Sequence, residues 1–140
     1  MKHLFCVCGV PFPGGAEIGL LRLLERLDDW RITVATPGPG ALSHALVSAG
    51  FDWVQLPVGG LEPRSGGRAV LSMPRARRHA RVADVVYLNG GVAARVMPAL
   101  RDARTALHVH DLVDRVPSHW RSANLVLADS QAVADRLVGL

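Results

Sequence analysis

The N-terminal stretch reads His3-Leu-Phe-Cys-Val-Cys-Gly-Val10, then Pro11-Phe-Pro-Gly-Gly15, then Ala16-Glu-Ile-Gly-Leu-Leu-Arg-Leu-Leu-Glu-Arg-Leu27. The first part is a continuous apolar run, which is typical of a strand buried on both faces of a parallel sheet. The Pro/Gly part predicts a turn, and the last part has the spacing of an amphipathic helix. Strand, glycine turn and helix in this order leave free backbone N–H groups at a helix N-terminus, which favour an anion such as a phosphate.

Gly14 and Gly15 in this turn allow two interpretations. Neither residue has a Cβ, so the backbone can approach a ligand closely. The alternative is that the two glycines only turn the chain between the strand and the helix. The G-x-G-x-x-G spacing of a dinucleotide-binding loop is absent, and no Lys-Ser/Thr follows the glycines as it does in a P-loop.

Composition favours one globular domain and excludes several other classes. The chain has 140 residues, of which 49% are apolar, so a sizeable core is expected rather than disorder. The net charge of +4 comes almost entirely from arginine and favours anionic partners. We expect no nucleic-acid partner, because no basic motif is interleaved with aromatic residues.

Cys6 and Cys8 are the only cysteines, and they lie two residues apart on the predicted first strand. This spacing places them on one face, where a mutual disulfide is unfavourable, so we expect buried free thiols in a reducing cytosol. The apolar run that follows Lys2 is short and ends at Pro11, which argues against a signal peptide. No apolar run has membrane-spanning length, and we expect a cytoplasmic protein.

Strand and helix patterns alternate along the rest of the chain. Further strands are predicted at 31–36, 52–57, 84–88, 105–109 and 124–128, and helical segments at 41–49, 68–83, 92–103, 118–123 and 131–140. Pro74 either kinks its helix or marks a later start, Pro98 lies inside the next helix, and residues 59–67 are expected to form a loop. The alternation predicts a doubly wound, Rossmann-like α/β domain over residues 1–140, with a parallel six-stranded sheet in the order 3-2-1-4-5-6.

Ligands of such sheets bind beyond the carboxyl ends of the strands. The turns expected at that edge are 11–15, 37–40, 88–91, 110–111 and 129–130. Adjacent strands are about 4.8 Å apart, so the glycine turn and His110 should lie within roughly 10 Å of each other, with Asn89 and Gly90 on the same rim. We therefore predict one cleft that contains Gly14, Gly15 and His110.

Several polar residues near this edge have alternative roles. His108 and His110 share a strand face as metal ligands would, but no companion carboxylate or histidine cluster is evident, so we expect no metal. His110 then either faces the cleft, with Asp111 beside it, or only caps the turn. Glu17 is expected to complement the helix dipole, and Ser130 or Asp129 to cap the last helix.

Four arginines gather on the predicted helix 68–83, namely Arg75, Arg77, Arg78 and Arg81. They form either a solvated helix face or a contact with anionic lipid headgroups.

Pro13-Gly-Gly-Ala-Glu17 after an apolar strand resembles the opening of glycosyltransferase family 4, a large group of retaining enzymes with the GT-B fold. Other segments are similar to that family in the same order: Thr36–Leu42 with Leu46, Ala49–Phe51 and Leu56–Pro57; Ala83–Tyr87; His108–Asp111; and Ala123–Ser130 with Ala132–Asp135. Asn124, where the family commonly has Asp, and Pro74 depart from the pattern. The second, donor-binding domain of the family has no counterpart in this sequence, which therefore resembles the N-terminal, acceptor-side domain alone.

The resemblance implies transfer of a sugar from a nucleotide-diphosphate donor to an acceptor hydroxyl, with retention and without a metal or a further cofactor. In that picture Gly14 and Gly15 hold the donor diphosphate, and His110 is the catalytic residue that faces the transferred sugar or the acceptor. We assign substrate contacts to Asn89, Gly90, Asp111 and Ser130.

The acceptor is expected to be a sugar or a lipid-linked molecule, so the protein can also lie at the inner face of the membrane. A donor-binding domain, in some cases on a partner chain, would supply the cationic clamp, and without it the domain should be inactive. Two alternatives remain: a non-catalytic doubly wound binding or regulatory module, and a metal hydrolase built on His108 and His110.

Overall fold

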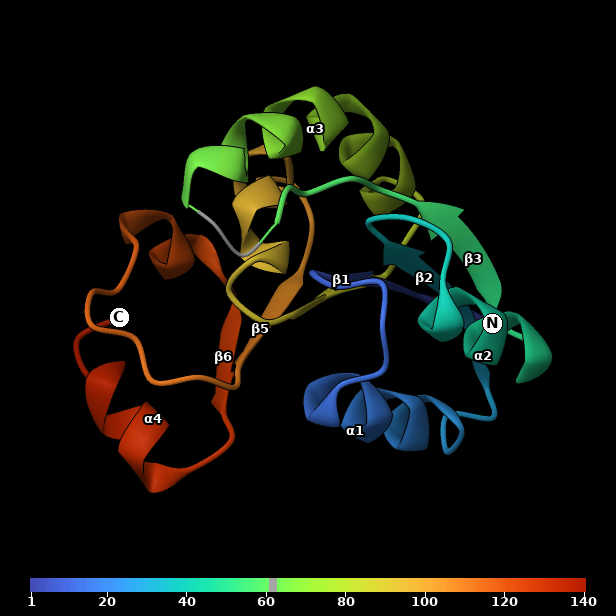
Figure 1. Ribbon diagram of the computed structural model, residues 1–140, viewed down its shortest axis with the longest axis horizontal. Helices are drawn as coiled ribbons and strands as arrows, with labels where there is room; N and C mark the ends of the chain where they lie inside the picture. Colours follow the sequence, from blue (N-terminus) through green and yellow to red (C-terminus); the bar gives the residue numbers. More distant parts are fainter. Residues whose placement is uncertain (61–62) are drawn as a thin grey trace.

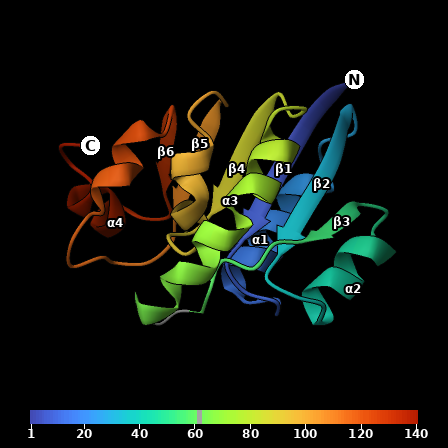
Figure 2. The ribbon, with the colours of Figure 1, turned by 90° about the horizontal axis from the view of Figure 1, so that it is seen from above.

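The computed structural model describes residues 1–60 and 63–140, in which six strands form one parallel sheet. The strands are β1 (Lys2–Cys8), β2 (Trp30–Thr36), β3 (Asp52–Gln55), β4 (Val85–Asn89), β5 (Thr105–Val109) and β6 (Leu125–Ala128). Their order is β3-β2-β1-β4-β5-β6, with β1 in the centre, as Figure 2 shows. The predicted Rossmann-like α/β fold, parallel direction and strand order are confirmed.

Helical segments cover both faces of the sheet, with α1 and α3 on opposite sides (Figure 1). They are α1 (Gly15–Leu24), α2 (Ala41–Ser48), α3 (Gly67–Ala80), α4 (Gln131–Arg136) and the 3₁₀ helices η1 (Pro63–Gly66), η2 (Ala93–Ala99) and η3 (Ser118–Ser122). Leu20 and Leu24 of α1 pack in one core cluster with Cys6. Phe5 and Val7 belong to the other cluster, together with α3 and η2. Alternate residues of β1 thus face two different layers, which explains its unbroken apolar run.

Both cysteines are buried free thiols, as the sequence predicted. Burial raises the pKa of the Cys6 thiol, with a smaller contribution from Cys8. Burial, together with the nearby Glu17 carboxylate, raises the pKa of Cys8 to about 12. Because the thiolate is the reactive form, both side chains act as small apolar residues of the core.

Several predicted boundaries were wrong by a few residues. The first strand ends at Cys8 rather than Val10, and its helix spans Gly15–Leu24 rather than 16–27. The last helix ends at Arg136 rather than at residue 140. Segment 92–103 was predicted as a long helix, but it is the 3₁₀ helix η2, which contains Pro98. Proline has no N–H to donate, so it cannot support a regular α-helical hydrogen-bond ladder there.

Pro74 neither starts nor ends α3, which runs through it from Gly67 to Ala80. The carbonyl that Pro74 leaves without its helical donor belongs to Val70, one turn earlier in the helix. Of the predicted loop 59–67, residues 63–66 form η1, and residues 61–62 lie outside the described residues. No helix among the described residues has the length and apolar character needed to cross a membrane.

Candidate functional site

A cleft of about 670 Å³ opens at the carboxyl edge of the sheet, over the ends of β1, β4 and β5. Five of the residues that the sequence predicted for a site line this one cleft: Gly15, Asn89, Gly90, His110 and Asp111. Phe12 and Trp120 add aromatic surface, and Glu17 and Asp129 add carboxylates. The topological part of the prediction, which brings the glycine turn and His110 to one rim, is confirmed.

The glycine turn presents backbone donors to this cleft. Gly14 is the N-cap of α1, and its carbonyl accepts the N–H of Ile18 at 2.9 Å. The Gly14 amide itself donates to the Phe12 carbonyl at 3.1 Å, so it is engaged within the turn. Among the described residues, the N–H groups of Gly15 and Ala16 have no hydrogen-bond partner. The first turn of α1 therefore offers the donors that an anionic or polar ligand can use.

Gly90 makes the sharp turn that follows β4. Its φ of +102° lies in the region that favours glycine, and its amide donates to the Leu88 carbonyl at 3.1 Å. A Cβ on the next residue, Gly91, would lie 2.8 Å from Cζ2 of Trp120, so this position must stay small for the aromatic ring to pack against the turn. The two glycines thus shape the cleft wall between β4 and η3.

Glu17 is buried rather than displayed to solvent, with 6% of its surface exposed. Oε1 of its carboxylate accepts a hydrogen bond from Nδ2 of Asn89 at 3.4 Å. The sequence predicted only that Glu17 would complement the dipole of α1. The structure adds a contact with β4 that joins the start of α1 to the middle of the cleft.

His110 is held between two side chains from neighbouring strands. Its Nδ1 lies 2.6 Å from Oδ2 of Asp129, and its Nε2 lies 2.8 Å from Oδ1 of Asn89. The His110 side chain is only 13% exposed, so the capping interpretation of this residue does not describe its surroundings.

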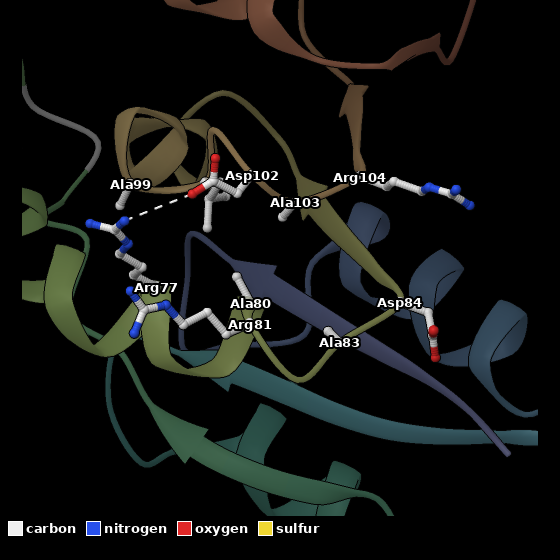
Figure 3. A pocket seen from close by; sticks show the side chains of 10 residues that line it. Arg77, Ala80, Arg81, Ala83, Asp84, Ala99, Asp102, Ala103 and Arg104 are labelled. Atoms are coloured by element: carbon white, nitrogen blue, oxygen red, sulfur yellow. Dashed lines mark ion pairs between the residues drawn. The ribbon is translucent and has the colours of Figure 1, made fainter.

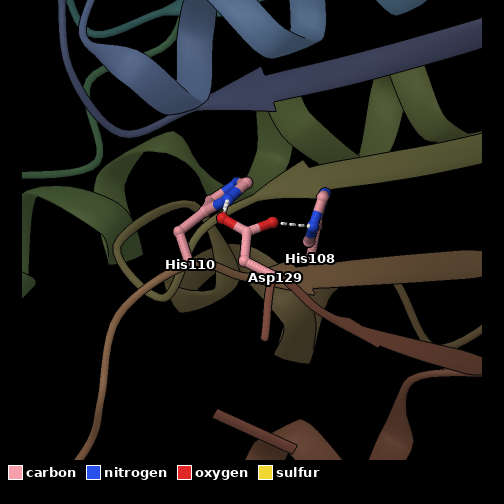
Figure 4. Close-up of side chains that lie close together, drawn as sticks. All are labelled: His108, His110 and Asp129. Carbon is pink, nitrogen blue, oxygen red and sulfur yellow. Dashed lines mark hydrogen bonds and ion pairs between the residues drawn. The ribbon is translucent and has the colours of Figure 1, made fainter. Parts of the chain in front are cut away.

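His108 binds the other oxygen of the same carboxylate, with Nε2 2.5 Å from Oδ1 of Asp129 (Figure 4). Its Nδ1 is hydrogen-bonded to the hydroxyl of Tyr87. These residues meet because alternate residues of a strand share a face and because Asn89 and His108 are register partners. Asp129 follows β6 directly, which brings its carboxylate between the two histidines.

Burial and charge set the ionisation of these groups. Partial burial alone would raise the pKa of Asp129. The hydrogen bond and the charge of His110 lower this pKa, His108 lowers it further, and the net pKa of Asp129 is below its usual value. The pKa of His108 is lowered, mainly because the ring is partly buried and to a smaller extent because of the charge of His110. The pKa of Tyr87 is raised to about 12, mainly because the side chain is partly buried and to a smaller extent because Cys6 is nearby. At neutral pH these shifts favour an ionised Asp129, a neutral His108 and a protonated Tyr87.

The sequence prediction that the histidine pair lacks a companion carboxylate was wrong. His108, His110 and Asp129 form a group whose potential metal-ligand atoms lie within 4.8 Å of one another. The sequence contained the information to predict this carboxylate, because Asp129 directly follows β6, and β6 lies beside β5 and ends at the same edge of the sheet. Ligands around tetrahedral zinc are about 3.3 Å apart at bond lengths near 2.0–2.1 Å. The separations of 2.5 and 2.6 Å are those of direct hydrogen bonds instead.

Ser130 caps α4, as predicted, because its side-chain oxygen accepts the N–H of Val133 at 3.3 Å. Ser130 and Gly14 do not belong to the residues that line the cleft, although each is adjacent to one that does. Their assigned contacts with substrate and diphosphate remain predictions.

A second cavity of about 460 Å³ lies at the opposite edge of the sheet (Figure 3). Arg77, Arg81 and Arg104 line it together with Asp84 and Asp102, and Arg77 is paired with Asp102 at 3.8 Å. Charges of both signs line this cavity, and none of the predicted site residues is among its lining residues. The cleft at the carboxyl edge is therefore the candidate site.

Comparison with solved structures places this fold beside two glycosyltransferases of the GT-B type. Anabaena Alr3699/HepE in complex with UDP matches with a TM-score of 0.74 and 24% identity over 99% of this chain, and its complex with UDP-glucose matches with a TM-score of 0.76 and 21% identity. Acinetobacter baumannii MurG matches with a TM-score of 0.71 and 17% identity over 91% of this chain.

These likenesses show the fold, which corresponds to the N-terminal half of such neighbours. The chain spans about 40% of the length of the HepE structures and 41% of that of MurG. No protein-family model matches the chain, and no curated protein matches it in sequence.

Proposed function

We propose that this domain is the N-terminal, acceptor-side part of a retaining glycosyltransferase akin to family 4. It would help to move a sugar from a nucleotide-diphosphate donor to an acceptor hydroxyl, with no metal and no cofactor beyond the donor itself. The observation that carries this proposal is the cleft, which combines free amides at the start of α1 with hydrogen-bonding side chains and an aromatic wall.

The lining of the cleft suits a sugar. Sugar hydroxyls donate and accept hydrogen bonds, and the carboxylates of Asp111 and Asp129 offer oxygen acceptors along the rim. Sugar rings also have apolar faces, which pack on aromatic surface such as that of Phe12 and Trp120. This combination favours a polyhydroxylated ligand over a purely apolar one.

Gly15, with Gly14 beside it, would receive the donor diphosphate, and His110 would face the transferred sugar or the acceptor. Asn89, Gly90, Asp111 and Ser130 would contribute further substrate contacts. Among the described residues that line the cleft, none is lysine or arginine, so neither of these side chains would meet the diphosphate charge from this domain's cleft. A donor-binding domain, on the same chain or on a partner, would supply the cationic clamp and with it full activity.

HepE has been solved with UDP and with UDP-glucose, which supports a nucleotide sugar as the ligand class here. The acceptor would be a sugar or a lipid-linked molecule, handled in the cytoplasm or at the inner face of the membrane. A non-catalytic binding or regulatory module is the alternative, because the same fold serves many unrelated functions.

Titration of the ¹⁵N-labelled protein with nucleotide sugars tests this proposal. We expect millimolar UDP-glucose, or another member of a panel that varies the base and the sugar, to shift the amide resonances of Gly15, Gly90 and His110. Gly15→Val should abolish these shifts, because a branched side chain would fill the space in front of the free amides.

Gly19→Val is the matched control, because a Cβ at Gly15 or at Gly19 would meet nothing within 4 Å and Gly19 does not line the cleft. This variant should bind like the unsubstituted protein. If no member of the panel shifts the cleft resonances, even after a donor-binding domain of a GT-B enzyme is added, the proposal is wrong and the non-catalytic module replaces it.

A further inference from the structure

Six side chains form one continuous hydrogen-bonded chain across the mouth of the sheet. In order they are Tyr87, His108, Asp129, His110, Asn89 and Glu17. They come from β4, β5 and the residue after it, the residue after β6, and α1, so side-chain hydrogen bonds link three neighbouring strands with one helix. We call these residues the rim relay. Its two ends are a tyrosine hydroxyl and a buried carboxylate.

The Glu17 end fixes the direction of the hydrogen bonds. A carboxylate accepts hydrogen bonds but cannot donate them, so the Asn89 amide must turn its Nδ2 toward Glu17. The Asn89 oxygen then faces Nε2 of His110 at 2.8 Å, and that nitrogen must carry a hydrogen to bond it. A flipped amide would bring two oxygens together in a buried place, which is unfavourable.

Asp129, on the other side of His110, fixes the state of the second ring nitrogen. Oδ2 of Asp129 lies 2.6 Å from Nδ1 of His110, and an ionised carboxylate accepts there as well. Both nitrogens of His110 therefore face acceptors, and the arrangement is complete only when both carry a hydrogen. His108 differs, because the Tyr87 hydroxyl can donate to its Nδ1 while Nε2 donates to Asp129.

We propose that Glu17, Asn89 and Asp129 are positioning residues that hold His110 in its doubly protonated, cationic form. His110 lines the same cleft as Gly15, so a fixed positive charge would stand near the free amides of α1. With both N–H groups engaged, His110 acts through its charge and not by transferring a proton. The role of His110 in the reaction rests on the proposed function. There, its positive charge would stabilise the negative charge that develops on the departing phosphate.

Nitrogen NMR of the histidine rings tests the state of His110 without any ligand. At pH 7.5 we expect two protonated-type ring nitrogens for His110, and one protonated and one unprotonated nitrogen for His108. A singly protonated His110 in the unsubstituted protein would overturn the proposal.

Variants then separate positioning from a merely structural role. Asn89→Leu removes one acceptor and Asp129→Asn removes the charged one, and each should leave His110 singly protonated while the remaining amide spectrum stays folded. Glu17→Gln allows the Asn89 amide to turn, and it should lower the doubly protonated fraction of His110.

Asp111→Asn is the matched control, because Asp111 is a carboxylate that lines the same cleft and follows His110 directly, but lies outside the rim relay. Here the ring spectrum of His110 should be unchanged. An equal effect of Asp111→Asn and Asp129→Asn would mean that general cleft charge, and not the relay, sets the state of His110, which contradicts the proposal.

Addition of zinc tests whether the same side chains bind a metal ion instead. The relay predicts that one equivalent of zinc leaves both histidine spectra unchanged, whereas a stoichiometric complex on His108, His110 and Asp129 would overturn it. Loss of nucleotide-sugar binding with the His110 signature intact would refute the proposed function and leave the relay standing.

Discussion

Gly9 and Gly15 lie at the two ends of the turn that leads from β1 into α1, and a side chain would meet different surroundings at each. A Cβ on Gly9 would lie 2.8 Å from the Cβ of Val92 and 3.1 Å from its Cγ1. A Cβ on Gly15 would meet nothing within 4 Å. Gly9 is therefore a packing requirement between β1 and the start of η2, while Gly15 borders open space in the cleft.

Substitution by alanine should separate these two roles. Gly9→Ala should lower the free energy of unfolding by about 1–3 kcal/mol, because neighbouring atoms must shift to admit the methyl group. Gly15→Ala should leave it unchanged or raise it by about 0.4–1 kcal/mol, since its backbone is ordinary and the unfolded chain loses freedom. Urea unfolding of both variants measures the difference, and equal destabilisation would contradict this account.

At the scale of elements, α3 carries the most exposed apolar side chain among the described helices. Leu71 and Val70 are 83% and 59% exposed, and Arg78 on the helix and Arg81 at its C-cap are exposed as well. Arg75 donates to the Gln55 carbonyl at 3.1 Å, and Arg77 pairs with Asp102. Apolar and basic side chains together suit a surface of anionic lipids, whereas a solvated face needs no exposed leucine.

If α3 contacts lipid, the protein should bind vesicles that contain anionic lipid, and binding should weaken with salt. The paired change Arg78→Glu with Arg81→Glu should reduce binding by at least about 2 kcal/mol, or roughly 30-fold, from about 1 kcal/mol per basic residue. Arg22→Glu with Arg26→Glu makes the same charge change in and just after α1 and should have a smaller effect. Equal binding to neutral and anionic vesicles would leave only the solvated face.

For the whole molecule, burial of histidine links stability to pH. Burial is the largest cause that lowers the pKa of His79, of His108 and of His119 in the folded protein. The unfolded chain therefore binds more protons than the folded one below the ordinary histidine pKa of about 6.5. Stability must then fall as the pH falls through this window.

We expect the midpoint of urea unfolding to decrease between about pH 6 and pH 5; above that range the proposed cationic form of His110 would act in the opposite direction. Asp129, with its lowered pKa, should add a second loss below about pH 4, because its contribution is present above the ordinary aspartate pKa and disappears as the carboxylate is protonated. His119→Gln, which removes one titrating group outside the cleft, should reduce the first loss. A midpoint that is flat or rises on acidification would contradict the assigned shifts.

The sequence alone determined the sheet and its functional edge. Apolar runs such as residues 3–8 and 105–109, separated by Pro/Gly turns and helical crossovers, predicted six parallel strands in the observed order. The reason is that strand periodicity is local and the handedness of crossovers is nearly invariant, so neither depends on distant side chains. The same rules brought Gly15, Asn89 and His110 to one rim.

Only the tertiary structure decided how those side chains are connected. The Asp129 carboxylate between His108 and His110 depends on the register of β5 against β6, and the burial of Glu17 against Asn89 depends on how α1 sits over β4. Register and helix placement are set by packing between residues far apart in the sequence, such as Glu17 and Asn89, which are 72 positions apart. Strand order alone brings Asp129 to the same edge as the two histidines, but hydrogen bonds act over about 3 Å, so it does not predict which donors and acceptors meet.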